Sequence, residues 1–114
     1  MLLTILKSKL HMGTVTSCEL YYQGSIAVDP KLLKAAGFYP NEKVAVLNFD
    51  NGQRFETYVI EGKAGEIGLR GPAAKLGKIG DRVIILSYAF MTPREAKKFK
   101  PRVILLDGKN HPKR

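Results

Sequence analysis

The sequence predicts a single, mainly β domain built as a small barrel. Its short apolar runs are rich in β-branched and aromatic residues and alternate with polar ones. Turn signals such as Asn51-Gly52 separate these runs at intervals of about ten residues, which is typical of all-β sandwiches and barrels. The chain has 114 residues, enough for one hydrophobic core but not for two.

The first predicted strand spans residues 2–12, and Gly13 is expected to end it. A period of two places Lys7, Lys9 and His11 on one face of this strand. That face is either a polar side turned to solvent or a group of two cations and an imidazole that serves a site. The strand pattern leaves both interpretations open.

Residues 14–22 predict a second strand, and β character resumes at residues 26–28. Asp29 is an N-cap residue followed by a proline at the first helical position, and Gly37 is a typical stop. These signals predict a helix of roughly two turns between Asp29 and Gly37.

Residues 43–49 predict a strand that turns back at Asn51-Gly52 into a return strand at residues 54–61. On the return strand, one face is expected to carry Arg54, Glu56 and Tyr58, and the other Phe55, Thr57 and Val59. The remaining predicted elements are strands at 66–69, 83–86 and 102–107 and one helical turn at 73–76.

A capping box predicts the start of a last short helix, with Thr92 at N-cap and Glu95 at N3, and Pro101 is expected to end it. The barrel domain is therefore expected to span residues 1–107. Residues 108–114 are expected to form a disordered basic tail.

The net charge is +9, from 19 Lys and Arg against 10 Asp and Glu. Such a charge suggests an anionic partner, namely nucleic acid, an anionic surface or an anionic substrate. Seven of the cations lie between Lys97 and the C-terminus, and the other cations are scattered. Because a basic tail is usually solvated and the aromatic residues are not interleaved with the cations, we expect no nucleic-acid partner.

No apolar run approaches the ~20 residues that cross a bilayer, and the apolar N-terminus lacks the basic residues and the cleavage site of a secretion signal. We therefore expect a cytoplasmic protein without a membrane partner. Cys18 is the only cysteine and is interpreted as a packing residue. No phosphate-binding loop or zinc pattern occurs, so no metal is expected.

The dipeptide Gly24-Ser25 interrupts an extended run between Tyr21 and Val28. On its own, a glycine followed by a small hydroxyl residue is typical of a turn or bulge between two strands. The residues around the dipeptide support a second interpretation.

Several motifs occur in a characteristic order and spacing: Lys9-Leu10-His11, Val15-Thr16, Glu19-Leu20-Tyr21-Tyr22-Gln23-Gly24-Ser25, Leu33 to Gly37, Asn51-Gly52-Gln53-Arg54-Phe55-Glu56-Thr57-Tyr58, and Gly80-Asp81. With these motifs, residues 2–107 resemble the pyruvoyl-dependent aspartate decarboxylase family. The resemblance implies a six-stranded double-psi β-barrel with short helices, assembled as a homotetramer. It also implies decarboxylation of L-aspartate to β-alanine and CO2 for pantothenate biosynthesis.

The resemblance further implies that the chain cuts itself between Gly24 and Ser25 into a β chain of residues 1–24 and an α chain of residues 25–114. In this family the serine hydroxyl attacks the glycine carbonyl, and the serine becomes a pyruvoyl group that holds the substrate as a Schiff base. Glycine suits this step because it tolerates a strained backbone and leaves its carbonyl open to attack. Thr57 resembles the family's helper hydroxyl.

Substrate roles also follow from the resemblance. Arg54 matches the bidentate anchor of a substrate carboxylate, and Lys9 matches a second cation. Tyr58 matches the proton donor. His11 and Tyr22 are expected to line the same pocket.

The substrate loop departs from the family pattern. The family usually has Asn-Gly-Ala-Ala where this chain has Arg70-Gly71-Pro72-Ala73. Gly71, Pro72 and Ala73, together with Thr57, are the expected substrate-binding residues of this region. Pro72 has no N–H to offer, and Arg70 adds a charge that the family lacks.

Two alternatives stay open at this point. One is a basic β-barrel that binds nucleic acid. The other is a barrel of the same fold with altered or lost chemistry, to which the changed loop points. Whether maturation requires a partner protein is also open.

Overall fold

The computed structural model describes residues 1–113. Its strands are β1 (Leu3–Thr14), β2 (Ser17–Glu19), β3 (Ser25–Val28), β4 (Lys43–Asn48), β5 (Arg54–Glu61), β6 (Ile67–Arg70), β7 (Arg82–Met91) and β8 (Arg102–Leu105). Its helices are α1 (Pro30–Ala36), the 3-10 helix η1 (Gly71–Lys75) and α2 (Pro93–Lys98). All three helices are short, so strands dominate the fold.

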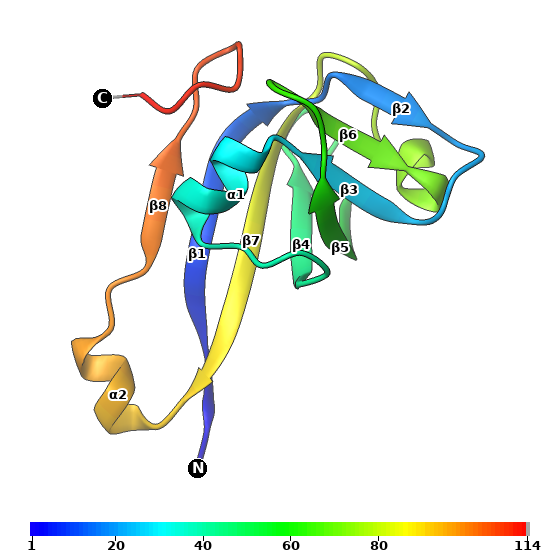
Figure 1. The fold of residues 1–114 in the computed structure, drawn as a ribbon. Coiled ribbons are helices and arrows are strands. Elements are labelled where there is room, and N and C mark those ends of the chain that lie inside the picture. Colours follow the sequence, from blue (N-terminus) through cyan, green and yellow to red (C-terminus); the bar gives the residue numbers. More distant parts are fainter. Residues whose placement is uncertain (114) are drawn as a thin grey trace.

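The strands form one sheet in the order β2-β6-β3-β5-β4-β7-β1-β8 (Figure 1). Three neighbouring pairs are parallel, namely β3 with β5, β2 with β6, and β1 with β8. Leaving out the end strands β2 and β8, six strands remain for the barrel. The architecture is mainly β and consistent with a double-psi β-barrel, so the predicted fold class is confirmed.

The residues between β1 and β2 close the sheet. The N–H of Val15 donates to the Asp81 carbonyl before β7, and the N–H of Thr16 donates to the Ile67 carbonyl in β6, both at 2.8 Å. The Thr16 hydroxyl also accepts a hydrogen bond from the Ile67 N–H at 3.0 Å. These contacts join β1 and β6, which are the two ends of the six-strand series.

The core consists of aliphatic side chains that the strands point into the barrel. Its largest fully buried members are Leu10, Val15, Ile26, Val28, Leu32, Val44, Val46, Val59, Ile67, Leu69, Val83 and Ile85. Each such side chain contributes about 1.5–3 kcal/mol when it leaves water. All four residues of β3 are buried, so this strand lies deepest in the core.

Both predicted helix caps are confirmed. The Asp29 carboxylate accepts from the Lys31 N–H at 2.8 Å, and Gly37 ends α1 in the left-handed conformation with φ of 72°. Thr92 and Glu95 form the expected reciprocal capping box of α2.

The prediction that Gly13 ends the first strand is wrong, because β1 continues to Thr14. Its register against β7 shifts between Leu10 and Gly13, where Met12 has φ of 67°. A β-bulge of this kind absorbs an extra residue without ending the strand.

The predicted common face of Lys7, Lys9 and His11 is interrupted. A second shift in register lies between Leu6 and Ser8, so the period of two does not hold across Lys7. The Lys7 ammonium pairs with the Glu42 carboxylate at 2.5 Å. Lys7 is therefore engaged in a contact of its own.

The predicted strand at residues 14–22 shrinks to β2, and residues 20–22 form a bend. The reason lies in its partner: β2 pairs with β6 only as far as Glu19 opposite Arg70, after which η1 begins. Without a partner strand, the β-prone residues 20–22 have no ladder to join. The strand predicted at residues 83–86 is longer than expected, because β7 pairs with β1 as far as Met91.

The predicted disordered tail is wrong for the described residues. β8 ends at Leu105, a bridge joins Leu106 to Pro112, and Asn110 is buried between them. The Asn110 side chain accepts from the Thr14 N–H and donates to the Thr14 and Gly65 carbonyls. This single amide ties the tail to the barrel, which composition alone does not reveal.

The start of β1 and the end of β7 extend beyond the barrel as a two-stranded arm with α2 beside its tip (Figure 1). The molecule is accordingly elongated, with a longest dimension of 43 Å. Several large apolar side chains of this arm are exposed, including Leu2 at 64% and Phe90 at 75%.

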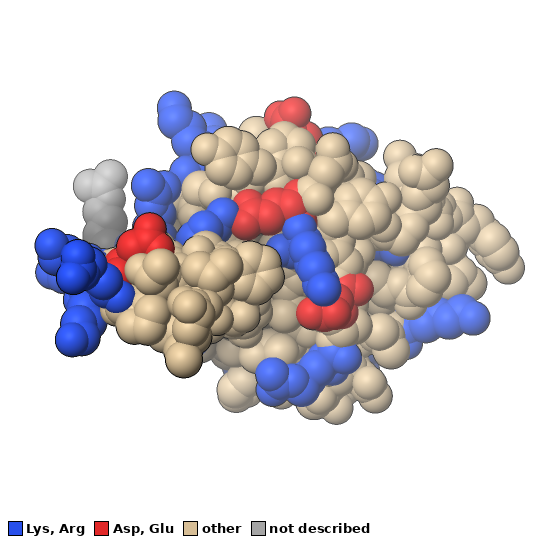
Figure 2. All heavy atoms as spheres, turned by 90° about the horizontal axis from the view of Figure 1, so that it is seen from below, with Lys and Arg blue, Asp and Glu red and all other residues tan. Residues whose placement is uncertain are grey.

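Lys and Arg side chains are distributed around the face seen from below, with Asp and Glu between them (Figure 2). They are densest at the left edge, on the side where Figure 1 places α2. On this face the positive charge forms no continuous surface.

Candidate active site

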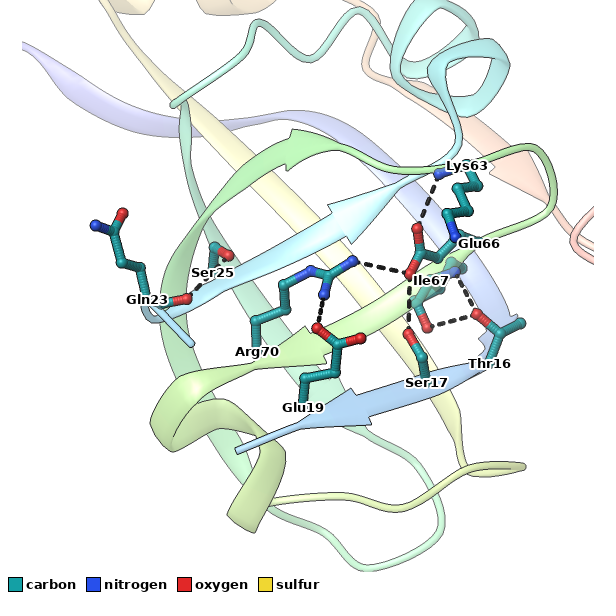
Figure 3. Close-up of polar contacts among 9 residues, drawn as sticks. All are labelled: Thr16, Ser17, Glu19, Gln23, Ser25, Lys63, Glu66, Ile67 and Arg70. Atoms are coloured by element: carbon teal, nitrogen blue, oxygen red, sulfur yellow. Dashed lines mark hydrogen bonds and ion pairs between the residues drawn. The ribbon is translucent and has the colours of Figure 1, made fainter. Parts of the chain in front are cut away.

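The candidate site begins at Ser25, the first residue of β3. β3 pairs with β6 on one side and with β5 on the other, which fixes the serine backbone, and Ser25 is only 1% exposed. Its hydroxyl donates to the Gln23 carbonyl at 3.3 Å (Figure 3). Gln23 itself is exposed, so the Gly24-Ser25 bond lies where the chain passes from the surface into the core.

Gly71 packs directly against the residues before Ser25. Its φ is +67°, and a Cβ added there would lie 2.6 Å from the Tyr22 carbonyl oxygen and 2.8 Å from the Gly24 nitrogen and Cα. Pro72 follows on the same side, with its Cδ 3.4 Å from the position of a Cβ at Gly24. The start of η1 therefore covers the Gly24-Ser25 bond closely.

A pocket of about 350 Å³ opens beside this bond. It is lined by Gly24, Phe55, Glu56, Thr57, Tyr58, Pro72, Ala73 and Leu76. The structure thus brings together five of the predicted site residues, contributed by the chain before β3, by β5 and by η1. Thr57 and Tyr58 of β5 thus line one cavity together with Gly24.

The other predicted substrate-binding side chains, Lys9, His11, Arg54 and Tyr22, lie outside this pocket. Lys9 and His11 belong to β1, which pairs with β7 and β8, and neither residue lines the pocket beside Gly24. Arg54 is at the exposed start of β5, outside the pocket lining. Tyr22 is exposed, and its ring lies under the Arg70 guanidinium at 4.7 Å.

The cations near the site differ in what they contact. Among the described residues, neither Arg54 nor Lys9 forms an ion pair. Arg70, in contrast, pairs with Glu19 and with Glu66. Of the predicted site residues within residues 1–113, Arg54 and Lys9 are therefore cations whose charge is not already paired with an acid.

Cys18 does not compete with Ser25 as a nucleophile. It packs against the core, and its thiol lies 3.7 Å from the Gly77 carbonyl oxygen. Burial, with a smaller contribution from Asp81, raises the pKa of the Cys18 thiol above its usual value. The thiol stays protonated at neutral pH, as expected of a packing residue.

Sequence patterns did not predict the contacts of Arg70 with Glu19, Glu66 and Tyr22. Opposite charges on neighbouring strands could have indicated the pair of Arg70 and Glu19. That prediction requires knowing the parallel register of β2 on β6, which places Glu19 opposite Arg70. The pocket walls Phe55 and Leu76 were missed for the same reason, because they depend on how η1 packs against β5.

Comparison with known proteins shows which family the chain belongs to. A model of the family described as aspartate decarboxylase matches residues 1–113. The chain belongs to the aspartate decarboxylase family. A family member from Chloroherpeton thalassium, named aspartate 1-decarboxylase, is 56% identical, with the match covering all of this chain and 85% of the relative.

Further aspartate decarboxylases show the same degree of likeness. Proteins named aspartate 1-decarboxylase from Pelotomaculum thermopropionicum and Caldicellulosiruptor bescii are 54% and 50% identical. Each match covers 96% of this chain, and 85% and 88% of the respective relative. The likeness spans the candidate site and the arm alike.

Two further features bear on cofactors and membranes. Among residues 1–113, no group of three or more His, Cys, Asp or Glu side chains is placed to hold a metal ion. No helix in this described part combines the length and the apolar character needed to cross a membrane.

We predict that Gly71→Ala destabilises the fold more than Gly52→Ala does. Both glycines have a positive φ, which costs about 1–2 kcal/mol for a residue with a Cβ. Only Gly71 also meets backbone atoms of Tyr22 and Gly24, and relieving such overpacking costs about 1–3 kcal/mol more. Thermal unfolding at matched protein concentration measures the difference. Equal shifts in Tm would show that the contact with the Gly24 segment is loose.

Proposed function

We propose that this chain decarboxylates L-aspartate to β-alanine and CO2, using a pyruvoyl group made from its own Ser25. The product would serve pantothenate biosynthesis, and the enzyme would work in the cytoplasm. The observation that carries the proposal is the buried Ser25 hydroxyl, held in β3 beside Gly24 and next to a pocket that contains Thr57 and Tyr58. Membership of the aspartate decarboxylase family supports the same chemistry.

Self-cleavage would begin with attack of the Ser25 hydroxyl oxygen on the Gly24 carbonyl carbon. The Gly24-Ser25 C–N bond breaks as an ester bond forms, and the serine nitrogen takes up the proton. Loss of the Ser25 Cα proton and of the Gly24 carboxylate gives dehydroalanine. Its hydrolysis releases ammonia and leaves a pyruvoyl group at residue 25, so no external oxidant or metal is needed.

The residues present fit this chemistry. Gly24 has no Cβ, so its carbonyl is accessible, and the Ser25 hydroxyl is already directed back toward the preceding turn by its bond to Gln23. The Thr57 hydroxyl in the adjoining pocket is the donor that would stabilise the oxyanion formed by the attack.

A pyruvoyl group supplies a carbonyl that binds the substrate amine and accepts the electrons released with CO2. The chain would supply binding and proton transfer. Arg54 would hold one substrate carboxylate with two parallel hydrogen bonds, and Lys9 would hold the other. Tyr58 would donate a proton to the carbon that loses CO2. Gly71 and Ala73 would offer backbone N–H groups to the substrate, whereas Pro72 has none to offer.

The site would be completed between subunits of a homotetramer. Lys9 and His11 lie outside the pocket beside Gly24, so they would reach a pyruvoyl group in a neighbouring subunit. The His11 Nδ1 atom is buried without a hydrogen-bond partner in the described chain, which is uncommon in a finished structure. The exposed apolar side chains of the arm offer a surface for such contacts.

The first prediction concerns cleavage. Warming the purified wild-type protein should convert it to fragments of residues 1–24 and 25–114, the second carrying an N-terminal pyruvoyl group. Ser25→Ala removes the nucleophile and should stay intact. Denaturing mass spectrometry separates these outcomes. A wild-type chain that stays whole alone but splits with a cell extract would instead indicate a maturation partner.

The second prediction concerns assembly. Light scattering at micromolar concentration should give the mass of four chains. Phe90→Glu places a charge on the exposed arm and should lower this mass, whereas Ile79→Glu, on an exposed apolar residue before β7, serves as the matched control. A wild-type monomer that still turns over aspartate would contradict sites shared between subunits.

The third prediction concerns the anchor. Arg54→Lys keeps the charge but loses one of two parallel hydrogen bonds, so kcat/KM should fall about 10- to 100-fold, the worth of a hydrogen bond to a charged group. Self-cleavage should be unchanged, because that step needs no substrate. Full activity in Arg54→Lys together with a sharp change in Arg70→Asn would assign the anchoring role to Arg70 instead.

Lys9→Gln and Tyr58→Phe separate binding from proton transfer in the same assay. Lys9→Gln should mainly raise KM, because it removes a contact made to the bound substrate. Tyr58→Phe should mainly lower kcat, because it removes a proton donor that acts only after CO2 has left.

A further inference from the structure

A cluster of charged residues lies beside the Gly24-Ser25 bond but outside the pocket. Its charged members are Arg70, Glu19 and Glu66 (Figure 3). Together with Tyr22, whose ring lies against the Arg70 guanidinium, we call them the arginine clasp. The Arg70 guanidinium pairs with Glu19 through one terminal nitrogen and with Glu66 through the other, the latter at 3.1 Å. Its Cζ atom lies 4.7 Å from the centre of the Tyr22 ring.

Glu66 is the fixed end of the clasp. Its carboxylate accepts from the Ser17 hydroxyl at 2.9 Å and from the Lys63 N–H at 2.8 Å, in addition to Arg70. Gly68, between Glu66 and Arg70 on β6, leaves room for this contact: a Cβ there would lie 2.9 Å from the Glu66 Oε2 atom. The side chains of Glu66 and Arg70 can therefore contact each other past Gly68.

Glu19 and Tyr22 are the other end of the clasp, and both precede the proposed cut. Residues 20–24 connect β2 to β3 as a bend. Among residues 1–113, no backbone-to-backbone hydrogen bond outside the strand ladders holds residues 20–24. Packing and side-chain contacts therefore hold this segment. Gly71 packs against Tyr22 and Gly24, and Arg70 contacts Tyr22 within the segment and Glu19 just before it.

The clasp is also tied to Ser25 itself. Arg70 is the backbone partner of Ser25 in the antiparallel ladder between β3 and β6. The next residue, Gly71, is the one that approaches Gly24 closely. Arg70 thus links the fixed nucleophile to the segment that carries the carbonyl under attack.

We propose that Arg70 is a positioning residue for self-cleavage, holding the segment from Glu19 to Gly24 so that the Gly24 carbonyl faces the Ser25 hydroxyl. The inference rests on the cleavage proposed above. An intramolecular attack is fast only when the reacting atoms are held near contact, and small misplacements slow it strongly. Ser25 is already fixed by β3, so the rate depends on how well the preceding segment is held.

The same contacts explain why Arg70 would not bind substrate. Its side chain is 13% exposed, and two carboxylates already face it. A planar guanidinium can pair with two carboxylates and stack on an aromatic ring at once, whereas a lysine ammonium cannot reproduce that geometry. We therefore expect Arg70 to govern maturation and not turnover.

The experiment follows cleavage of freshly purified precursor by denaturing mass spectrometry and then measures β-alanine formation per cleaved chain. Arg70→Gln should slow cleavage about tenfold, equivalent to about 1.4 kcal/mol of barrier. Activity per cleaved chain should stay within about twofold of wild type. Arg70→Lys should restore part of the cleavage rate, because it keeps the charge but not the fork.

Arg82→Gln is the matched control. Arg82 also pairs with an acid, Asp50, and stacks on an aromatic ring, that of Phe49 at 4.8 Å, but at a hairpin away from Ser25. Its loss should leave the cleavage rate unchanged. Glu19→Gln tests the clasp from its other end, where the side chain is half exposed, and should slow cleavage in the same direction as Arg70→Gln but less.

The outcomes separate this inference from the proposed function. A wild-type chain that never cleaves overturns the proposed function. Cleavage of wild type, Arg70→Gln and Glu19→Gln at equal rates overturns the role of Arg70 while leaving the function intact. If Arg70→Gln fails to fold, the cleavage rate of Glu19→Gln tests the proposal in its place. A loss of turnover in Glu19→Gln as large as its loss of cleavage would show that the clasp has a purely structural role and would overturn the proposal.

Discussion

The hydrogen bonding of β3 on both of its sides is the constraint on which the site depends. β3 is buried along its whole length, Ser25 pairs with Arg70 of β6, and from Ile26 onward the strand also pairs with β5. Ser25 is therefore fixed, while Gly24 immediately before it is only partly buried. The two neighbouring strands deliver the remaining local groups: β5 carries Thr57 and Tyr58, and β6 leads into the loop at Gly71.

Under the proposed mechanism, the single chain would have an incomplete site. The pairing that places β5 and β6 next to β3 places Lys9 on β1, which pairs with β7 and β8, and Lys9 does not line the pocket beside Gly24. The exposed apolar arm and the unpartnered ring nitrogen of His11 belong to this same β1 and β7 region. Assembly of several chains would both cover these groups and supply the missing cation.

Local signals predicted the local structure well. Asp29 and Gly37 marked α1 because capping depends on neighbouring residues alone, and Asn51-Gly52 marked the hairpin for the same reason. Features set by distant partners were not predictable. Residues 20–22 looked like a strand but lack a partner, and the tail looked disordered because nothing in its composition shows that one amide, Asn110, reaches Thr14 and Gly65. The motif around Ser25 was evident from sequence, whereas the Arg70 contacts needed the register of β2 on β6.

The measurement that tests the central claim most directly is product formation from L-aspartate before and after reduction with borohydride, which destroys a ketone but spares ordinary side chains. The account predicts equal amounts of β-alanine and CO2 from the wild-type protein, with activity lost after reduction and absent from Ser25→Ala. β-Alanine formation that survives reduction, or that persists in Ser25→Ala, would contradict a reaction centred on residue 25.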